Sequence, residues 1–400
     1  MFKKLVSLFL IISFALCASA CGSLNGSESD TEAPGSSEQE SLSKTPVLGK
    51  DGTEIGWIDS RAYSTAVNGG IFYSIFAPEE YHYTADAEYH YFDMETGRDI
   101  LLGKLEGQGY EAGYTRTELD GKIYTLAVTG NVMSDTAVTL YLLVSDPVSG
   151  TMNKITVSTN GFPYAFMAVS DGKLLVMNHE MTEPKCDKIY EYDPVDGTVR
   201  EVLSFPSNTD SLRGISSAED GFFVLRLKLN AGKENELFLD RYSNEFVRIS
   251  EKSLNETLVN AILKIHGITG RNDALNELGM NVADFTVLKD RYLIYENFGL
   301  VRLLVDLQTN EELFVKDDIY SVSVGSGGIV FYKMAFEEDG TDPDISVFRE
   351  GKLVNFDFKP KDSHKLIKEI STSYTGLWLV LTSDAKPAQD RTYVIQLLTE

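Results

Sequence analysis

Short runs of aliphatic and aromatic residues, separated by polar turn residues, fill the chain from about residue 60 onward. Each run is too short for an amphipathic helix and is rich in Ile, Val, Tyr and Phe, the composition that favours strands. A turn followed by such a run occurs seven times, beginning at Asn68, Asp120, Asp171, Asp220, Lys289, Gly327 and Thr375. The pattern therefore predicts an all-β body made of similar units.

A second turn follows each of the first three runs at a similar distance. It reads Asp-Met-Glu-Thr-Gly at 93–97, Asp-Pro-Val-Ser-Gly at 146–150 and Asp-Pro-Val-Asp-Gly at 193–197. Asp-Pro suits the start of a turn and Gly tolerates a positive φ, so each segment predicts a hairpin. The units recur about every 50 residues, close to the period of a four-stranded propeller blade.

Seven units of this kind predict a seven-bladed β-propeller of four-stranded blades over residues 46–400. A β-sandwich also has many short strands, but it rarely repeats itself this often. The repeats resemble those of bacterial propeller-type repeat proteins without matching a subfamily. Neither the Trp-Asp dipeptide of one large propeller class nor the Ser-x-Asp-x-Gly-x-x-Trp box of sialidase-like propellers is present.

Two departures from the repeat carry further predictions. The last unit is one strand short, and the β-like segment 47–58 precedes the first unit, so we expect the N-terminal strand to close the ring. Trp57 and Trp378 would then share a blade. Between units four and five, residues 251–281 predict a small helical insertion, with a capping box that begins at Ser253. This helix would shield a blade edge or, as the alternative, dock a partner.

The N-terminal residues predict export. Lys3 and Lys4 precede an apolar run that ends near residue 20, the order of a signal peptide over 1–20. The segment Ala-Ser-Ala-Cys-Gly at 18–22 resembles the bacterial lipoprotein box, which implies diacylglycerol on Cys21 and an extracytoplasmic position at the cell membrane. Ordinary signal-peptidase cleavage and free secretion is the alternative. Residues 21–45 are rich in Ser, Gly and Glu and predict a flexible tether.

Charge and cysteine content narrow the partners. The formal net charge is −24, which disfavours nucleic acid as a partner because phosphates would be repelled. The same negative charge repels anionic lipid surfaces, so we expect the protein to contact the membrane only through its N-terminal lipid. Cys186 is the one cysteine of the predicted folded body, and a single thiol forms no disulfide within the chain.

The long connections between strands should share one face of the disc, and they vary in composition, so we look for binding residues there. The candidates are Tyr81, His82, Tyr83, His179 and Glu180 in these connections, together with His90, which would lie on a strand paired with the segment 81–83. Aromatic and imidazole rings of this kind can stack on sugar rings or on a partner surface. Alternation along a half-buried hairpin explains some of them equally well. An acidic connection at 337–344 offers oxygen ligands to calcium, but a solvated acidic loop is favoured, and no metal or cofactor is predicted.

No catalytic motif occurs in the sequence, neither His-Glu-x-x-His nor Gly-x-Ser-x-Gly nor a phosphate-binding glycine loop. We therefore expect a binding or scaffold protein that presents propeller loops to a protein or glycan ligand. The alternative is an extracytoplasmic propeller hydrolase or lyase that acts on polysaccharide or peptide. A polar site of convergent carboxylate, Arg and His would favour the enzyme, and a flat aromatic or apolar patch would favour the binder.

Overall fold

The computed structural model describes most of the predicted body. The described residues are 44–48, 53–59, 63–76, 85–129, 137–181, 183–230, 236–266, 271, 283–297, 301–316, 320–325, 328–333, 345–349, 351–355, 366–372, 378–383 and 393–398. They form strands and one helix of 12 residues. Tyr81, His82, Tyr83 and the acidic connection 337–344 lie outside the described residues.

The first half of the chain forms a ten-stranded antiparallel sheet. Its strands are β3 (Tyr63–Val67), β4 (Gly70–Phe76), β5 (Ala85–Asp93), β6 (Arg98–Leu119), β7 (Lys122–Thr129), β8 (Val138–Asp146), β9 (Thr151–Ser170), β10 (Lys173–Glu180), β11 (Cys186–Asp193) and β12 (Thr198–Pro206). The two longest strands, β6 and β9, each bridge two successive four-stranded units. β6 pairs with β5 up to Gly109 and with β7 beyond it, and β9 pairs with β8 up to Gly161 and with β10 beyond it.

Three separate four-stranded antiparallel sheets follow. They are β13 (Asp210–Ser217) to β16 (Arg248–Ser253) with β14 (Phe222–Lys228) and β15 (Glu236–Tyr242); β17 (Ala283–Leu288) to β20 (Glu311–Lys316) with β18 (Tyr292–Asn297) and β19 (Val301–Asp306); and β21 (Tyr320–Gly325) to β24 (Lys352–Asn355) with β22 (Gly328–Lys333) and β23 (Ile345–Arg349). In each sheet the strands lie in chain order.

The two ends of the chain share the last sheet. Its strands are β25 (Leu366–Thr372), β26 (Trp378–Ser383), β27 (Tyr393–Leu398), β1 (Lys44–Leu48) and β2 (Glu54–Asp59), and β1 joins β27 in parallel through Val47 and Leu48. Trp57 on β2 and Trp378 on β26 therefore belong to one sheet. The segment predicted as one spare strand is split into two strands, β1 and β2.

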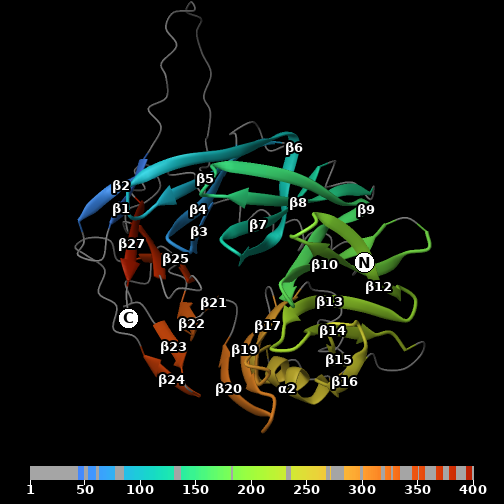
Figure 1. Ribbon diagram of the computed structural model, residues 1–400. Coiled ribbons are helices and arrows are strands. Elements are labelled where there is room, and N and C mark those ends of the chain that lie inside the picture. The colour runs from blue at the N-terminus through green and yellow to red at the C-terminus, as the bar shows by residue number, and fades with distance from the viewer. Residues whose placement is uncertain are drawn as a thin grey trace, which may run out of the picture.

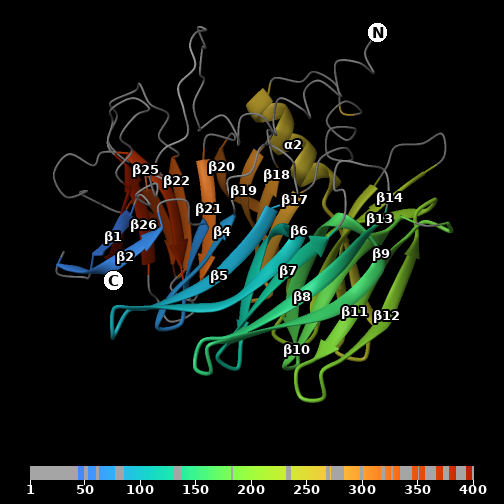
Figure 2. The ribbon, with the colours of Figure 1, turned by 90° about the horizontal axis from the view of Figure 1, so that it is seen from above.

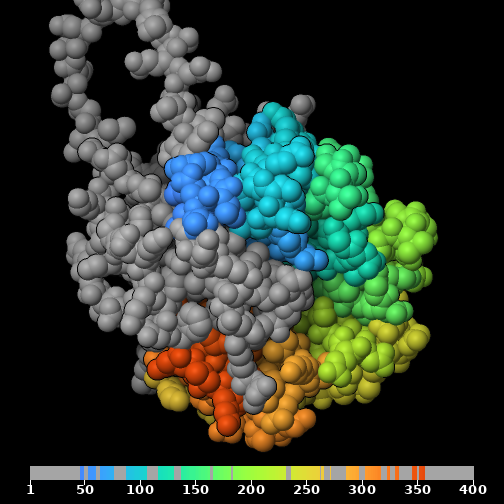
Figure 3. Space-filling view, turned by 60° about the vertical axis from the view of Figure 1, so that its left-hand side comes forward, coloured from blue at the N-terminus to red at the C-terminus, as the bar shows by residue number. Residues whose placement is uncertain are grey.

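The sheets stand one after another around a common centre (Figure 1), and their surfaces follow the same circuit in chain order (Figure 3). Apolar side chains fill the space between neighbouring sheets. For example, Leu175 and Ile189 of the β9–β12 unit pack with Phe222 and Val224 of the β13–β16 sheet, and all four are fully buried. Radially packed four-stranded antiparallel sheets are the architecture of a β-propeller. The predicted propeller body is confirmed.

Turn chemistry explains why the predicted hairpins form. The side chain of Asp193 accepts the backbone N–H of Val195 at 2.9 Å, and Gly197 has a φ of 72° and donates its N–H to the carbonyl oxygen of Asp193. The turns at 93–97 and 146–150 repeat these contacts. These turns and those at Gly121 and Gly172 lie at one end of the strands, which we call the short-turn end (Figure 2).

The opposite end of the strands, which we call the long-connection end, carries helix α2 (Asn255–His266) (Figure 2). The predicted capping box is wrong in detail, because Ser253 still belongs to β16 and the helix begins at Asn255. Leu254 and Leu258 are fully buried against the β13–β16 and β17–β20 sheets, so this helix packs on the disc. The side chains of Ile262 and Ile265 lie outside the described residues.

Candidate functional site

His179 is the one predicted binding residue whose ring is both described and substantially exposed. It stands near the end of β10, directly opposite Asp187 on β11, at the long-connection end. Its Nδ1 is hydrogen bonded to Oδ1 of Asp187, and the side chain is 32 % exposed. Oδ2 of Asp187 accepts the backbone N–H of Leu212 at 2.6 Å. The imidazole is therefore held by a carboxylate that is itself fixed to the next sheet.

The ring of Phe162 lies beside the ring of His179. The two rings meet edge to face, with centroids 6.2 Å apart and planes at 88°. Asn178 holds the backbone of Phe162 on both sides, because Oδ1 accepts the Phe162 N–H at 3.1 Å and Nδ2 donates to the Phe162 carbonyl at 2.9 Å. A side chain at Gly161 would come within 2.6 Å of that Asn178 oxygen, so the chain needs glycine at this crossing.

Glu180 lies on the other face of β10 and does not join His179. Its carboxylate is buried and accepts hydrogen bonds from the hydroxyls of Ser158, at 2.7 Å, and Tyr190. Burial and the hydrogen bond to Glu180 raise the pKa of Tyr190. These contacts give Glu180 the role of a structural acceptor between two units, and they leave little of its surface for a ligand.

His90 lies in the first unit, far from His179 in the sequence, and is mostly buried. Its ring stacks on Tyr73 with centroids 4.8 Å apart, and its nitrogens lie 3.3 Å from Asp99 and 3.4 Å from Glu88. Burial lowers the pKa of His90, but the hydrogen bonds with Asp99 and Glu88 outweigh burial and leave the pKa raised. The tyrosines on either side of it, at 89 and 91, are buried in the core.

Arg213 directly follows Leu212, the residue whose backbone N–H is bonded to Asp187. Arg213 occupies a bulge in β13 between Leu212 and Gly214. Burial lowers the pKa of its guanidinium, while the charges of Asp187 and Tyr295 act in the opposite direction. Arg213 is thus electrostatically linked to the carboxylate that holds His179.

A cluster of carboxylates surrounds Arg226 on β14. This guanidinium bonds Asp240 through Nε at 2.6 Å and Nη2 at 3.2 Å, Asp210 through Nη1 at 2.7 Å, and Glu251 through Nη2 at 2.5 Å. Burial alone would lower the pKa of Arg226, but hydrogen bonds with Asp240 and Asp210 outweigh it and raise the pKa. Each of the guanidinium nitrogens therefore has a carboxylate partner.

Sequence reasoning named His179 but missed Asp187, Phe162 and Arg213. Asp187 could have been found from the hairpin register, since it stands opposite His179 once the turn is placed. Phe162 and Arg213 depend on a strand crossing and a bulge, for which the sequence carries no local signal.

No cluster of three or more potential metal ligands occurs among the described residues. Within the same residues, no helix is long and apolar enough to cross a membrane. The His179 position thus consists of an imidazole that the buried carboxylate of Asp187 fixes and that lies beside the ring of Phe162.

Comparison with known proteins finds structural likeness only. No family model matches the sequence, and neither does any curated protein. Similar solved structures include an acylaminoacyl peptidase from Pyrococcus horikoshii, with 11% identity and a TM-score of 0.42 over 68% of this chain and 43% of that one. The matched part of this chain thus spans less than half of that peptidase.

Two further structures cover more of their own length. The β-propeller domain of the Trilobed protease from Pyrococcus furiosus has 10% identity and a TM-score of 0.41, over 68% of this chain and 77% of that one. Polysaccharide lyase Uly1 has 10% identity and a TM-score of 0.48, over 88% of this chain and 96% of that one. Because these scores are all below 0.5, the fold assignment rests on sheet order and register.

Proposed function

We propose that this chain is a lipid-anchored, extracytoplasmic binding protein. Cleavage of a signal peptide at 1–20 leaves Cys21 as the acylated N-terminus, and residues 21–45 connect it to a propeller on the outer face of the cell membrane. The propeller presents its long-connection end to a protein or glycan ligand. In this proposal it acts without a cofactor and as a binder or scaffold.

The strand pairing supports a count of seven blades. The ten-stranded sheet divides at Gly109 and Gly161 into three units of four strands. Three four-stranded sheets and the sheet shared by the two chain ends complete the series. In this assignment β1 closes the ring beside β27, and α2 is an insertion between the fourth and fifth blades.

The fixed, partly exposed imidazole of His179 is the observation that carries the binding proposal. Asp187 holds the ring, and the Leu212 N–H from the next sheet holds Asp187. A ligand that contacts such a ring loses little conformational entropy on the protein side. The adjoining ring of Phe162 adds an apolar surface. Aromatic and imidazole rings suit both sugar rings and peptide side chains.

The same pair favours the second candidate, a propeller hydrolase or lyase that acts on polysaccharide or peptide. A carboxylate on Nδ1 orients an imidazole so that Nε2 can accept a proton from a substrate, the arrangement of a general base. The sequence carries no catalytic motif, and for this reason we place binding first.

Binding of the purified protein to arrays of oligosaccharides and of peptides tests the proposal. We expect the protein to bind a defined subset of one array without cleaving it, and His179→Ala to weaken that binding at least tenfold. Asp187→Asn should weaken it as well, because the ring loses its fixed carboxylate. Val195→Ser, at a side chain that is 94 % exposed at the short-turn end, is the matched control and should bind normally.

Two results would contradict the binding proposal. One is that the protein binds neither array, or that His179→Ala binds as well as the unchanged protein. The other is that mass spectrometry detects shortened oligosaccharides or peptides after incubation, and that these products are absent with His179→Ala. That second result would show that the protein is a hydrolase or lyase that depends on His179.

A further inference from the structure

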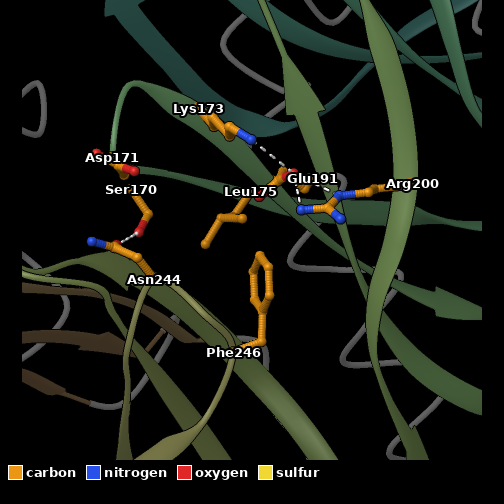
Figure 4. A pocket seen from close by; sticks show the side chains of 8 residues that line it. All are labelled: Ser170, Asp171, Lys173, Leu175, Glu191, Arg200, Asn244 and Phe246. Carbon is orange, nitrogen blue, oxygen red and sulfur yellow. Dashed lines mark hydrogen bonds and ion pairs between the residues drawn. The ribbon is translucent and has the colours of Figure 1, made fainter.

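A pocket with a volume of about 80 Å³ opens at the short-turn end, away from His179. It lies between the β9–β12 unit and the turn that joins β15 to β16 (Figure 4). Leu175, fully buried, and Phe246 form its apolar part, while Lys173, Glu191 and Arg200 line one side. The opposite side carries Ser170 and Asn244.

Phe246 has an unfavourable backbone conformation, which the hydrogen bonds of its turn maintain. Its φ is +64°, which bulky residues rarely adopt. The turn is maintained by the Phe246 N–H, which donates to the Ser243 carbonyl at 3.0 Å, and by the Ser243 N–H, which donates to Val247 at 2.9 Å. The ring lies 6.0 Å from that of Phe222 and below the Arg200 guanidinium at 5.9 Å. Such strain is commonly retained where a ring has a role in binding.

Glu191 supplies a hydrogen-bond acceptor that its neighbours leave open. Its side chain is 7 % exposed. Oε1 takes the bonds from Arg200, whose Nε and Nη2 both lie at 2.7 Å, and from Lys173 at 3.3 Å. Within the described part of the chain, the hydrogen bonds that Glu191 receives all go to Oε1. The second oxygen of this mostly buried side chain is therefore available to a ligand that donates a hydrogen bond.

The charges that line the pocket cancel, because the two cations Lys173 and Arg200 stand beside the two carboxylates Asp171 and Glu191. Lys173 also pairs at 3.1 Å with Asp193, which is not part of the lining. A charged ligand would gain attraction from one pair and lose it to the other. The electrostatics therefore select a neutral ligand that can both donate and accept hydrogen bonds.

We propose that this pocket binds a neutral hydroxylated ligand, one edge of a terminal hexose unit of a glycan. Sugar C–H groups can pack on the Phe246 ring, while hydroxyls donate to Glu191 Oε2 and accept from Arg200. Ser170 donates to Asn244 Oδ1 at 2.7 Å, which fixes the amide on the far side. The site is separate from the His179 position and does not rest on the proposed function.

Saturation-transfer NMR on the purified protein tests this site, with the methyl glycosides of glucose, galactose, mannose and N-acetylglucosamine as probes. We expect at least one to bind with the weak affinity typical of a single ring. Arg200→Gln should weaken binding at least tenfold and should keep the fold, because Lys173 remains bonded to the Glu191 carboxylate. Phe246→Ala should have a similar effect, and Val148→Ser, at an exposed turn, should have none.

Acetate and ethylammonium serve as charged probes in the same experiment. Binding of a hexoside that is lost in Arg200→Gln and in Phe246→Ala, with no response from either ion, supports the proposal. It is overturned if none of the glycosides binds, if a charged probe binds in their place, or if both variants bind the glycoside as well as the unchanged protein.

Discussion

Replacement of Arg226 with methionine is expected to lower the free energy of unfolding by about 3–5 kcal/mol. The Arg226 side chain is 6 % exposed and that of Asp240 is 0 % exposed, so loss of the guanidinium strands a carboxylate away from water. Asp210 and Glu251 lose their shared partner at the same time. The measurement is urea unfolding followed by circular dichroism.

An exposed ion pair provides the control for Arg226. Arg271 bonds Glu256 at 2.9 Å, and the Glu256 side chain is largely exposed. Arg271→Met should cost less than about 1 kcal/mol, since exposed pairs contribute little. The double variant Arg226→Met with Asp240→Leu should recover part of the loss, because it removes the buried charge along with its partner. A loss below about 1 kcal/mol for Arg226→Met would contradict this account of the cluster.

Gly221→Ala is expected to cost about 3 kcal/mol or more, the range of backbone strain combined with a steric clash. Gly221 has a φ of +105°, and a Cβ placed on it would lie 2.0 Å from the carbonyl oxygen of Tyr242. That oxygen belongs to the backbone of β15 and cannot move aside cheaply. The β13–β14 turn or its pairing with β15 must distort instead.

Gly172 is the matched control, because it occupies the equivalent turn of the preceding unit. Its φ is +69°, and a Cβ on it would meet nothing within 4 Å. Gly172→Ala should therefore cost only about 1 kcal/mol, the penalty of the left-handed region offset in part by a less flexible unfolded chain. Equal losses for the two variants, by the same urea measurement, would show that the clash at Tyr242 is not what requires glycine.

Local turn chemistry made much of the fold predictable. Gly121 and Gly172 adopt the positive φ that the hairpin prediction requires, and Asp290 takes this conformation where the repeat lacks glycine. Asp is among the few other residues that tolerate it. The sequence did not show that β6 and β9 each run through two units, because no turn residue is needed where a strand continues. Nor did it show that β1 pairs with β27 in parallel.

The candidate site was less predictable, because its parts come from different sheets. His179 was identified as a polar ring beside a long connection, but its fixation depends on a carboxylate across the hairpin and a backbone N–H of the following sheet. These contacts arise only when the sheets are packed. Glu180 shows the converse case, since its place in the sequence beside His179 puts it on the opposite face of the strand.

The intact mass of the mature protein tests the proposed anchor most directly, when measured on material from membranes of its own host beside a Cys21→Ala variant. The account predicts a mass increase of diacylglycerol size on a chain that begins at Cys21, absent from the variant, which should leave the membrane fraction. An unmodified chain recovered from the medium would contradict the anchor and would place the propeller among freely secreted proteins.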